Sequence, residues 1–207
     1  MSGSGRDETD YPPVFTTTDK VKFLVQDTGY RQIFDVPEYW FDDIGTTDRV
    51  IDIGANVGAF CIRAFRHSQK IVAVEPLTAS LLRENIRLNG VSVQVIEGAL
   101  GDGKPKTVRW DDYEVMTPTF PLRKLIEMAG GCDFLKCDCE GAEWSITPED
   151  LKGVRRIEME LHLPPISGPP NPALLDYISR HYDFEIEQKP VHTALGVMGV
   201  LHAERKI

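Results

Sequence analysis

The sequence lacks a long apolar run, since no stretch approaches the roughly 18 to 20 residues with which a helix spans a bilayer. It also lacks an excess of positive charge: 23 lysines and arginines stand against 32 aspartates and glutamates, for a formal net charge of -9. The first absence excludes a membrane-spanning protein. The second makes nucleic acid a disfavoured partner, because a negative surface repels phosphate backbones.

Cysteine is scarce, with four in 207 residues. A chain of this length buries about 70% of its unfolded surface and needs neither disulfides nor metal to hold a core. No signal peptide is recognised, so reduced thiols in a cytoplasmic protein are expected. Cys132, Cys137 and Cys139 crowd together without the Cys-x-x-Cys pairs of zinc frameworks, and Cys137 and Cys139 share one face of an expected strand. We therefore expect core thiols and no metal site.

Strand and helix patterns alternate through most of the chain. Apolar runs predict strands at 49–53, 71–75, 91–97, 132–138 and 151–162, with an extra strand at 106–110. Helical periodicity predicts helices at 59–67, 77–90, 121–131 and 171–182. Such alternation implies a mostly parallel, doubly wound α/β sheet with helices on both faces. Two final strands, at 183–188 and 194–204, predict a closing antiparallel hairpin.

One domain is expected over 20–207. Within it we predict a covering segment with a short hairpin at 20–47, a ligand-binding core at 48–162, and a C-terminal helix and hairpin at 163–207. The first 19 residues begin with small and polar side chains, so a flexible tail is expected over 1–19.

The turn after the strand 49–53 carries the first chemical signal. In open parallel sheets, ligands bind at the carboxyl ends of the strands where the strand order reverses. The turn reads DIGANVG, with Asn56 and Ala59 where a dinucleotide fingerprint has its second and third glycines. Gly54 and Gly58 permit a sharp turn and close approach to a ligand, and Asn56 tolerates left-handed backbone. The turn therefore predicts a ligand other than a dinucleotide.

Two carboxylates narrow the ligand further. Glu75 ends the next strand, 75 − 52 = 23 residues after Asp52, close to the spacing that places a carboxylate on ribose hydroxyls. A carboxylate accepts two hydrogen bonds from a vicinal diol. At the mouth of the turn, Asp52 would repel a pyrophosphate and attract an ammonium group, directly or through water. The ligand is predicted to be an adenosine that carries a cationic amino-acid tail.

Three motifs, VIDIGANVGAF at 50–60, AVEP at 73–76 and FLKCDCEGAEW at 134–144, resemble those of the FkbM-type family of class I S-adenosylmethionine methyltransferases. The resemblance covers roughly residues 48–162 and implies S-adenosyl-L-methionine as cofactor. It implies an active-site rim at Asp138, Glu140, Gly141 and Glu143, with cysteines in place of the usual isoleucine and valine beside Asp138. The cofactor-binding residues that it implies are Asp52, Gly54, Asn56, Gly58, Glu75, Glu97, Gly98, Ala99 and Leu100.

Three residues are the catalytic candidates: Asp138, Glu140 and His162. Asp138 and Glu140 lie at the carboxyl end of a predicted strand, where an acid can equally cap a following helix. His162 ends the strand at 151–162 and would reach the same rim, where a neutral imidazole can take a proton from an acceptor. A satisfied surface histidine is the alternative, and both readings stay open.

The resemblance implies methyl transfer, mainly to hydroxyls of small molecules or glycans. N-methylation of RNA or protein is an alternative, because NIRLNGV at 85–91 is similar to a helix of tRNA guanine methyltransferases. Their Asn-Pro-Pro-type motif would fall where this chain has Asp138-Cys139-Glu140. A non-catalytic cofactor-binding module is the alternative of another class, and three rim carboxylates argue against it.

Overall fold

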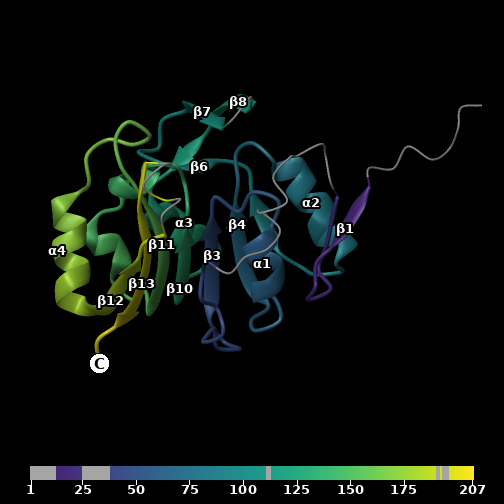
Figure 1. Ribbon diagram of the computed structural model, residues 1–207, viewed down its shortest axis with the longest axis horizontal. Coiled ribbons are helices and arrows are strands. Elements are labelled where there is room, and N and C mark those ends of the chain that lie inside the picture. Colours follow the sequence, from purple (N-terminus) through teal and green to yellow (C-terminus); the bar gives the residue numbers. More distant parts are fainter. Residues whose placement is uncertain (1–12, 25–37, 111–112, 190–191, 193–195) are drawn as a thin grey trace, which may run out of the picture.

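The computed structural model describes residues 13–24, 38–110, 113–189, 192 and 196–207. Its main feature is a seven-stranded sheet with the order β12-β13-β11-β10-β3-β4-β5 (Figure 1). The strands are β3 (Arg49–Ile53), β4 (Lys70–Val74), β5 (Gln94–Ile96), β10 (Phe134–Cys137), β11 (Arg156–His162), β12 (Tyr182–Glu187) and β13 (Val197–Arg205). Only β13 runs against the others, because it pairs antiparallel with both β11 and β12. The predicted doubly wound sheet with a closing antiparallel hairpin is confirmed.

The strand order reverses between β3 and β10. From β3 the chain proceeds to β4 and β5 on one side, and the later strands fill the other side. Cys137 at the end of β10 pairs in register with Ile53 at the end of β3. The turn after β3 and the segment after β10 therefore start side by side at the same edge of the sheet, where ligands bind in this architecture.

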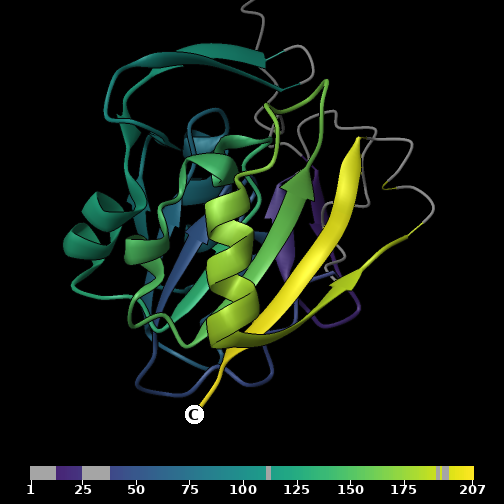
Figure 2. The same ribbon diagram turned by 90° about the vertical axis from the view of Figure 1, so that its left-hand side faces the viewer.

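Helices cover both faces of the sheet. They are α1 (Ala59–Ala64), α2 (Ala79–Leu88), α3 (Leu122–Ala129) and α4 (Pro172–His181), with 3-10 turns η2 (Ala142–Ser145) and η3 (Pro148–Leu151). Side chains alternate across a strand, so neighbouring residues of β3 belong to the hydrophobic cores on opposite faces of the sheet. Val50 packs with α1 and α2, and Ile51 packs with α3 and α4. Figure 2 shows α4 lying across the face of the sheet. No helix in the described part of the chain is long and apolar enough to cross a membrane.

Three smaller pairs of strands surround the sheet. They are β1 (Val14–Thr16) with β2 (Lys22–Leu24), β6 (Ala99–Leu100) with β9 (Thr119–Phe120), and β7 (Lys106–Trp110) with β8 (Tyr113–Thr117). The extra strand predicted at 106–110 is β7, the first half of an antiparallel hairpin. This hairpin lies above the main sheet in Figure 1.

The described part of the N-terminal region forms a pair of strands. Strand β1 lies within residues 1–19, where a flexible tail was predicted, and pairs antiparallel with β2. The Thr-Gly turn at 28–29, on which the predicted short hairpin rests, lies outside the described residues. Each of these strands has three residues, too few for a clear alternating pattern in the sequence. The backbone of β2 bonds the side-chain amides of Asn85 in α2 and of Asn89 just after it.

The segment after residue 37 packs against polar side chains of the sheet. Tyr39 is buried, and the backbone N–H of Trp40 donates to Glu158 Oε2 over 2.9 Å. The Trp40 ring stacks on His202, with ring centroids 4.0 Å apart. These contacts bring Tyr39 next to the carboxyl end of β10.

Asn85 links the N-terminal strands to the turn after β3. Its side chain is fully buried, its Nδ2 donates to the Val57 carbonyl over 2.9 Å, and its Oδ1 accepts from the Leu24 N–H over 2.8 Å. Replacing Asn85 with leucine leaves two buried backbone groups without partners. Because each such group costs about 1 to 3 kcal/mol, we expect the free energy of unfolding to fall by about 2 to 5 kcal/mol in urea denaturation.

The control is Asn89→Leu, since Asn89 bonds the N–H and carbonyl of Lys22 where water can replace it. It should lose less than about 1 kcal/mol. Equal losses in the two variants would contradict the structural role given to Asn85.

Candidate functional site

A cavity of about 570 Å³ opens at the carboxyl ends of β3, β4 and β10. The turn after β3, the end of β4, strands β6 and β7 and the segment after β10 form its walls. Of the residues predicted from the sequence, it is lined by Gly54, Asn56, Glu75, Ala99, Leu100, Asp138, Glu140 and Gly141. The volume is in the range of small-molecule sites, about 300 to 1,000 Å³.

The backbone of the turn requires the residues found there. Gly54 has φ 71°, and a Cβ at this position would lie 1.6 Å from the carbonyl oxygen of Asp138. Asn56 adopts φ 47°, the left-handed conformation that asparagine tolerates. Gly58 does not line the cavity; a Cβ there would lie 2.7 Å from Leu82 Cδ1, so this glycine lets α1 approach α2. Gly54 and Asn56 thus form the wall, and Gly58 supports it.

Asp52 lies behind the turn rather than in the cavity wall. It is fully buried, and its Oδ1 lies 3.1 Å from Nζ of Lys136, its register partner on β10. Lys136 donates to the carbonyl oxygen of Gly54 over 2.8 Å. Burial lowers the pKa of Lys136, but the negative charges of Asp52 and Asp138 more than offset this, and the pKa is raised. In the structure Asp52 therefore acts on the turn through Lys136, and the direct contact with a ligand ammonium expected from the sequence is not part of this geometry.

Sequence reasoning missed Lys136. Its place in the sequence could have indicated it, since Lys136 stands inside an otherwise apolar strand, FLKC. Lysine is almost never fully buried without a partner. The alternation of the strand also places Lys136 on the same face as Phe134, toward α1 and α2.

The Glu75 side chain is buried more deeply than a carboxylate at the edge of the cavity would be. It is buried, and its oxygens accept from the backbone N–H groups of Asn56 (2.8 Å), Leu77 (2.7 Å) and Thr78 (3.0 Å). A carboxylate offers about four acceptor sites, so these three bonds leave capacity for a hydroxyl. Glu75 therefore ties the turn to the loop after β4 and still contributes to the cavity wall.

The four predicted cofactor-binding residues at 97–100 do not all face the cavity. Ala99 and Leu100 line the cavity, but Glu97 and Gly98 do not. The Glu97 side chain is 61% exposed and pairs with Arg83 over 3.0 Å. Gly98 permits close packing, since a Cβ there would lie 2.7 Å from the Phe120 ring. Only the apolar half of this loop faces the space where a ligand would lie.

Asp138 and Glu140 reach the cavity from the segment after β10. The Tyr39 hydroxyl donates to Asp138 Oδ2 over 3.0 Å. The following turn η2 has Gly141 at its N-cap and no side-chain cap hydrogen bond, so the helix-capping alternative for the two acids does not apply. Burial and the nearby charge of Asp138 raise the pKa of Glu140.

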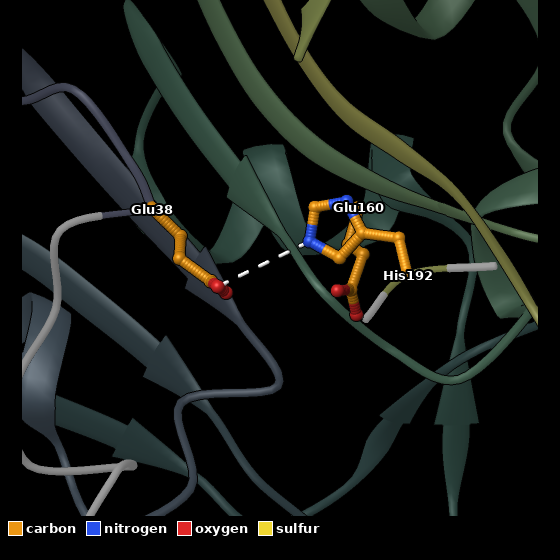
Figure 3. A group of neighbouring side chains, drawn as sticks. All are labelled: Glu38, Glu160 and His192. Carbon is orange, nitrogen blue, oxygen red and sulfur yellow. Dashed lines mark ion pairs between the residues drawn. The ribbon is translucent and has the colours of Figure 1, made fainter. Parts of the chain in front are cut away.

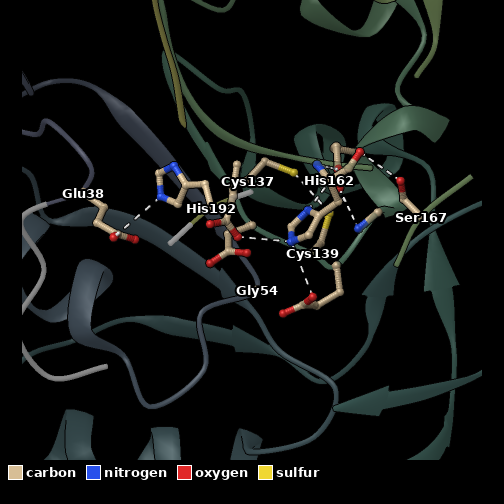
Figure 4. Close-up of polar contacts among 12 residues, drawn as sticks. Glu38, Gly54, Cys137, Cys139, His162, Ser167 and His192 are labelled. Atoms are coloured by element: carbon tan, nitrogen blue, oxygen red, sulfur yellow. Dashed lines mark hydrogen bonds and ion pairs between the residues drawn. The ribbon is translucent and has the colours of Figure 1, made fainter. Parts of the chain in front are cut away.

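His162 is buried at the end of β11, so it is not a surface histidine. Figure 4 shows its ring among polar partners: Nδ1 lies 3.0 Å from Glu143 Oε1, and Nε2 lies 3.1 Å from Glu160 Oε2 and 3.4 Å from Glu140 Oε2. Burial lowers the pKa of His162, but the hydrogen bonds to Glu143 and Glu160 outweigh it and raise the pKa to about 11. With the groups that the structure describes around it, the ring is a cation at neutral pH.

Two glutamates around His162 differ from the sequence expectation. Glu143, assigned to the rim, is fully buried and also accepts from the backbone N–H groups of His162 and Gly141. Glu160 was missed, and burial raises its pKa to about 7. The spacing in the sequence could have revealed Glu160. Glu158, Glu160 and His162 are two residues apart and therefore share one face of β11.

His192 lies next to Glu160 and Glu38 (Figure 3). It is only 2% exposed, and its Nε2 lies 4.0 Å from Glu38 Oε1. The Lys189 backbone N–H donates to Nδ1 over 3.1 Å, so the neutral ring carries its proton on Nε2. Within the described residues this Nε2 has no hydrogen-bond partner. His192 was not among the site residues predicted from the sequence, and its Nε2 is directed at the Glu38 carboxylate.

The family model described as the methyltransferase FkbM domain matches residues 52–186. Among solved structures, an rRNA methylase from Streptococcus thermophilus is 10% identical, with a TM-score of 0.52 over 79% of this chain and 90% of that one. A dimethyladenosine transferase from Plasmodium falciparum is 12% identical, with a TM-score of 0.51 over 80% and 58%. An uncharacterized Listeria monocytogenes protein is 14% identical (TM-score 0.48, 79% of this chain), and the present chain covers 64% of its length. None of the curated proteins matches.

Gly54 gives the sharpest test of the cavity wall. Gly54→Ala would drive a Cβ into the Asp138 carbonyl and displace the turn, so we expect at least about a tenfold loss of S-adenosylhomocysteine affinity in titration calorimetry, equivalent to about 1.4 kcal/mol. The matched control is Gly90→Ala, because Gly90 also has positive φ, 65°, but has nothing within 4 Å of its Cβ position. If both variants bind equally well, the turn does not form the ligand wall.

Proposed function

Because the chain belongs to the FkbM family of S-adenosylmethionine-dependent methyltransferases, we propose that its cavity binds S-adenosyl-L-methionine and that it methylates a hydroxyl of a small molecule or glycan. The observation that carries the proposal is the convergence of a glycine turn, a buried carboxylate at the end of β4 and an acidic rim on one cavity. The cofactor supplies an electrophilic methyl group when bound.

The residues present fit that cofactor. Gly54 forms a cradle that any side chain would fill, and the turn at 54–56 is the proposed wall for the methionyl end. Glu75 is the proposed ribose partner, with acceptor capacity beyond its three backbone bonds. The apolar side chains of Ala99 and Leu100 are the proposed adenine wall. Glu97, Gly98, Gly58 and Asp52 then support these walls rather than contact the cofactor.

The acceptor side is proposed to lie at Asp138, Glu140 and His162. In the transfer, the acceptor oxygen bonds to the methyl carbon as the carbon–sulfur bond breaks, and the hydroxyl proton must leave. Asp138 and Glu140 line the cavity and can attract that proton. His162, held as a cation between carboxylates, is better suited to balancing their charge than to accepting a proton.

The net charge of -9 and the acidic rim support a neutral or cationic acceptor. An rRNA methylase and a dimethyladenosine transferase share the fold, but likenesses of 10% and 12% identity concern the fold alone. We therefore keep nucleic acid as a disfavoured acceptor. The direct experiment is transfer of labelled methyl from S-adenosylmethionine to fractionated small molecules, glycans, RNA and protein. Label in the hydroxyl-bearing fractions supports the proposal, and label confined to RNA or protein would overturn it.

Asp138→Asn separates catalysis from cofactor binding. The amide keeps the shape of the side chain and can still bond Tyr39, but it removes the negative charge at the rim. We expect single-turnover methylation of the acceptor found above to slow by about 10²- to 10⁴-fold, as for loss of a positioned acid-base group. Affinity for S-adenosylhomocysteine should change less than about threefold, because Asp138 is placed on the acceptor side. A variant with normal turnover would remove Asp138 from the chemistry.

A further inference from the structure

We propose that Asp138, Glu140 and His162 form a divalent-cation site on the acceptor side of the cavity. One imidazole nitrogen and one oxygen from each carboxylate all lie within 4.8 Å of one another. The acids come from the segment after β10 and the imidazole from the end of the neighbouring strand β11. The site deepens the proposed function, and its catalytic meaning rests on that function.

The orientation of His162 suits a metal ligand. Its Nδ1 faces Glu143, a buried carboxylate that already accepts two backbone N–H bonds and can only accept when ionised. Nδ1 therefore carries a proton, and Nε2 faces Glu160 and Glu140. Metal-binding histidines almost always donate their second ring N–H to a carboxylate or carbonyl in this way. A bare Nε2 lone pair would repel the two carboxylates, so a positive charge belongs at this position.

A divalent ion balances the charges better than a proton on His162 does. Asp138, Glu140 and Glu160 surround the Nε2 position, and Lys136, 4.0 Å from Asp138, is already paired with Asp52. One proton leaves most of that negative charge uncompensated. Carboxylate oxygens are ligands that Mg²⁺ and Mn²⁺ prefer, and imidazole extends the set to Fe²⁺.

His192 supplies an independent indication that an oxygen ligand belongs here. Its Nε2–H is buried, lacks a partner within the described residues, and lies within 4.8 Å of oxygens of Glu38 and Glu160. Glu160 in turn touches His162. Because Nδ1 of His192 accepts from Lys189, its Nε2 is a donor and not itself a ligand. This unpaired donor lies next to the cation site through Glu160, and it suits an oxygen at the edge of that site, such as an ion-bound water.

Such an ion would bind the acceptor oxygen and lower the pKa of its hydroxyl. The proton leaves to solvent, the oxygen forms its bond to the methyl carbon, and the carbon–sulfur bond breaks to release S-adenosylhomocysteine. The three rim residues then act together through the ion. The sequence pointed to no metal because only its cysteines were considered, whereas these ligands are brought together by the pairing of β10 with β11.

The test is titration of the full chain with Mn²⁺, in the presence of S-adenosylhomocysteine, while electron paramagnetic resonance reports the free ion. We expect one bound Mn²⁺ per chain. Glu140→Gln and His162→Gln should each weaken binding by at least about 10- to 100-fold, the loss seen even for outer-shell partners. Glu140 is 43% exposed, so its variant should fold. The control Glu84→Gln removes an exposed carboxylate on α2 and should bind Mn²⁺ as the parent chain does.

The other possible outcomes test the cation site and the proposed function separately. If Mn²⁺ does not bind while S-adenosylhomocysteine does, the proposed function stands and the cation site is wrong. Mn²⁺ binding that Glu140→Gln and His162→Gln leave unchanged would also contradict the site. If Mn²⁺ binds at these residues but S-adenosylhomocysteine does not bind, the ion site stands and the proposed function fails.

Discussion

The buried ion pair between Lys136 and Asp52 is the constraint on which the rest of the site depends. The two residues are register partners on β10 and β3, the strands between which the sheet order reverses. Breaking such a buried pair is strongly destabilising, by about 3 to 5 kcal/mol, because one charge is left without a partner. Lys136 also donates to the carbonyls of Ile53 and Gly54. One ammonium group therefore fixes both the register of the central strands and the start of the turn after β3.

The same ammonium connects the two halves of the cavity. Lys136 lies 4.0 Å from Asp138, which also accepts from the Tyr39 hydroxyl. On the neighbouring strand, ionisable side chains continue along the same face to His162. The polar groups thus form one chain of contacts from the turn after β3 to His162 at the end of β11. At the end of this chain, Nδ1 of His162 faces the Glu143 carboxylate, whereas Nδ1 of His192 accepts from the Lys189 backbone N–H.

The sequence predicted the sheet, because apolar runs and helical periods are local signals. It also placed Gly54, Asn56, Glu75, Asp138 and Glu140 at strand ends, and the structure puts all five on one cavity. Lys136, Glu160 and Tyr39 were not found, since their roles arise from strand register and from a segment far away in the sequence. Asp52 and Glu143 were recognised as acids, but burial, which sequence spacing does not report, places both behind the walls.

The central claim is that this cavity recognises a nucleoside with a methionyl tail, through the turn that Lys136 and Asp52 hold. It is tested most directly by titration calorimetry of the full chain with S-adenosylhomocysteine and, separately, with NAD. The account predicts saturable binding of S-adenosylhomocysteine with one site per chain and no detectable binding of NAD, because Asn56 and Ala59 replace the glycines that admit a pyrophosphate. Tighter binding of NAD than of S-adenosylhomocysteine would contradict it.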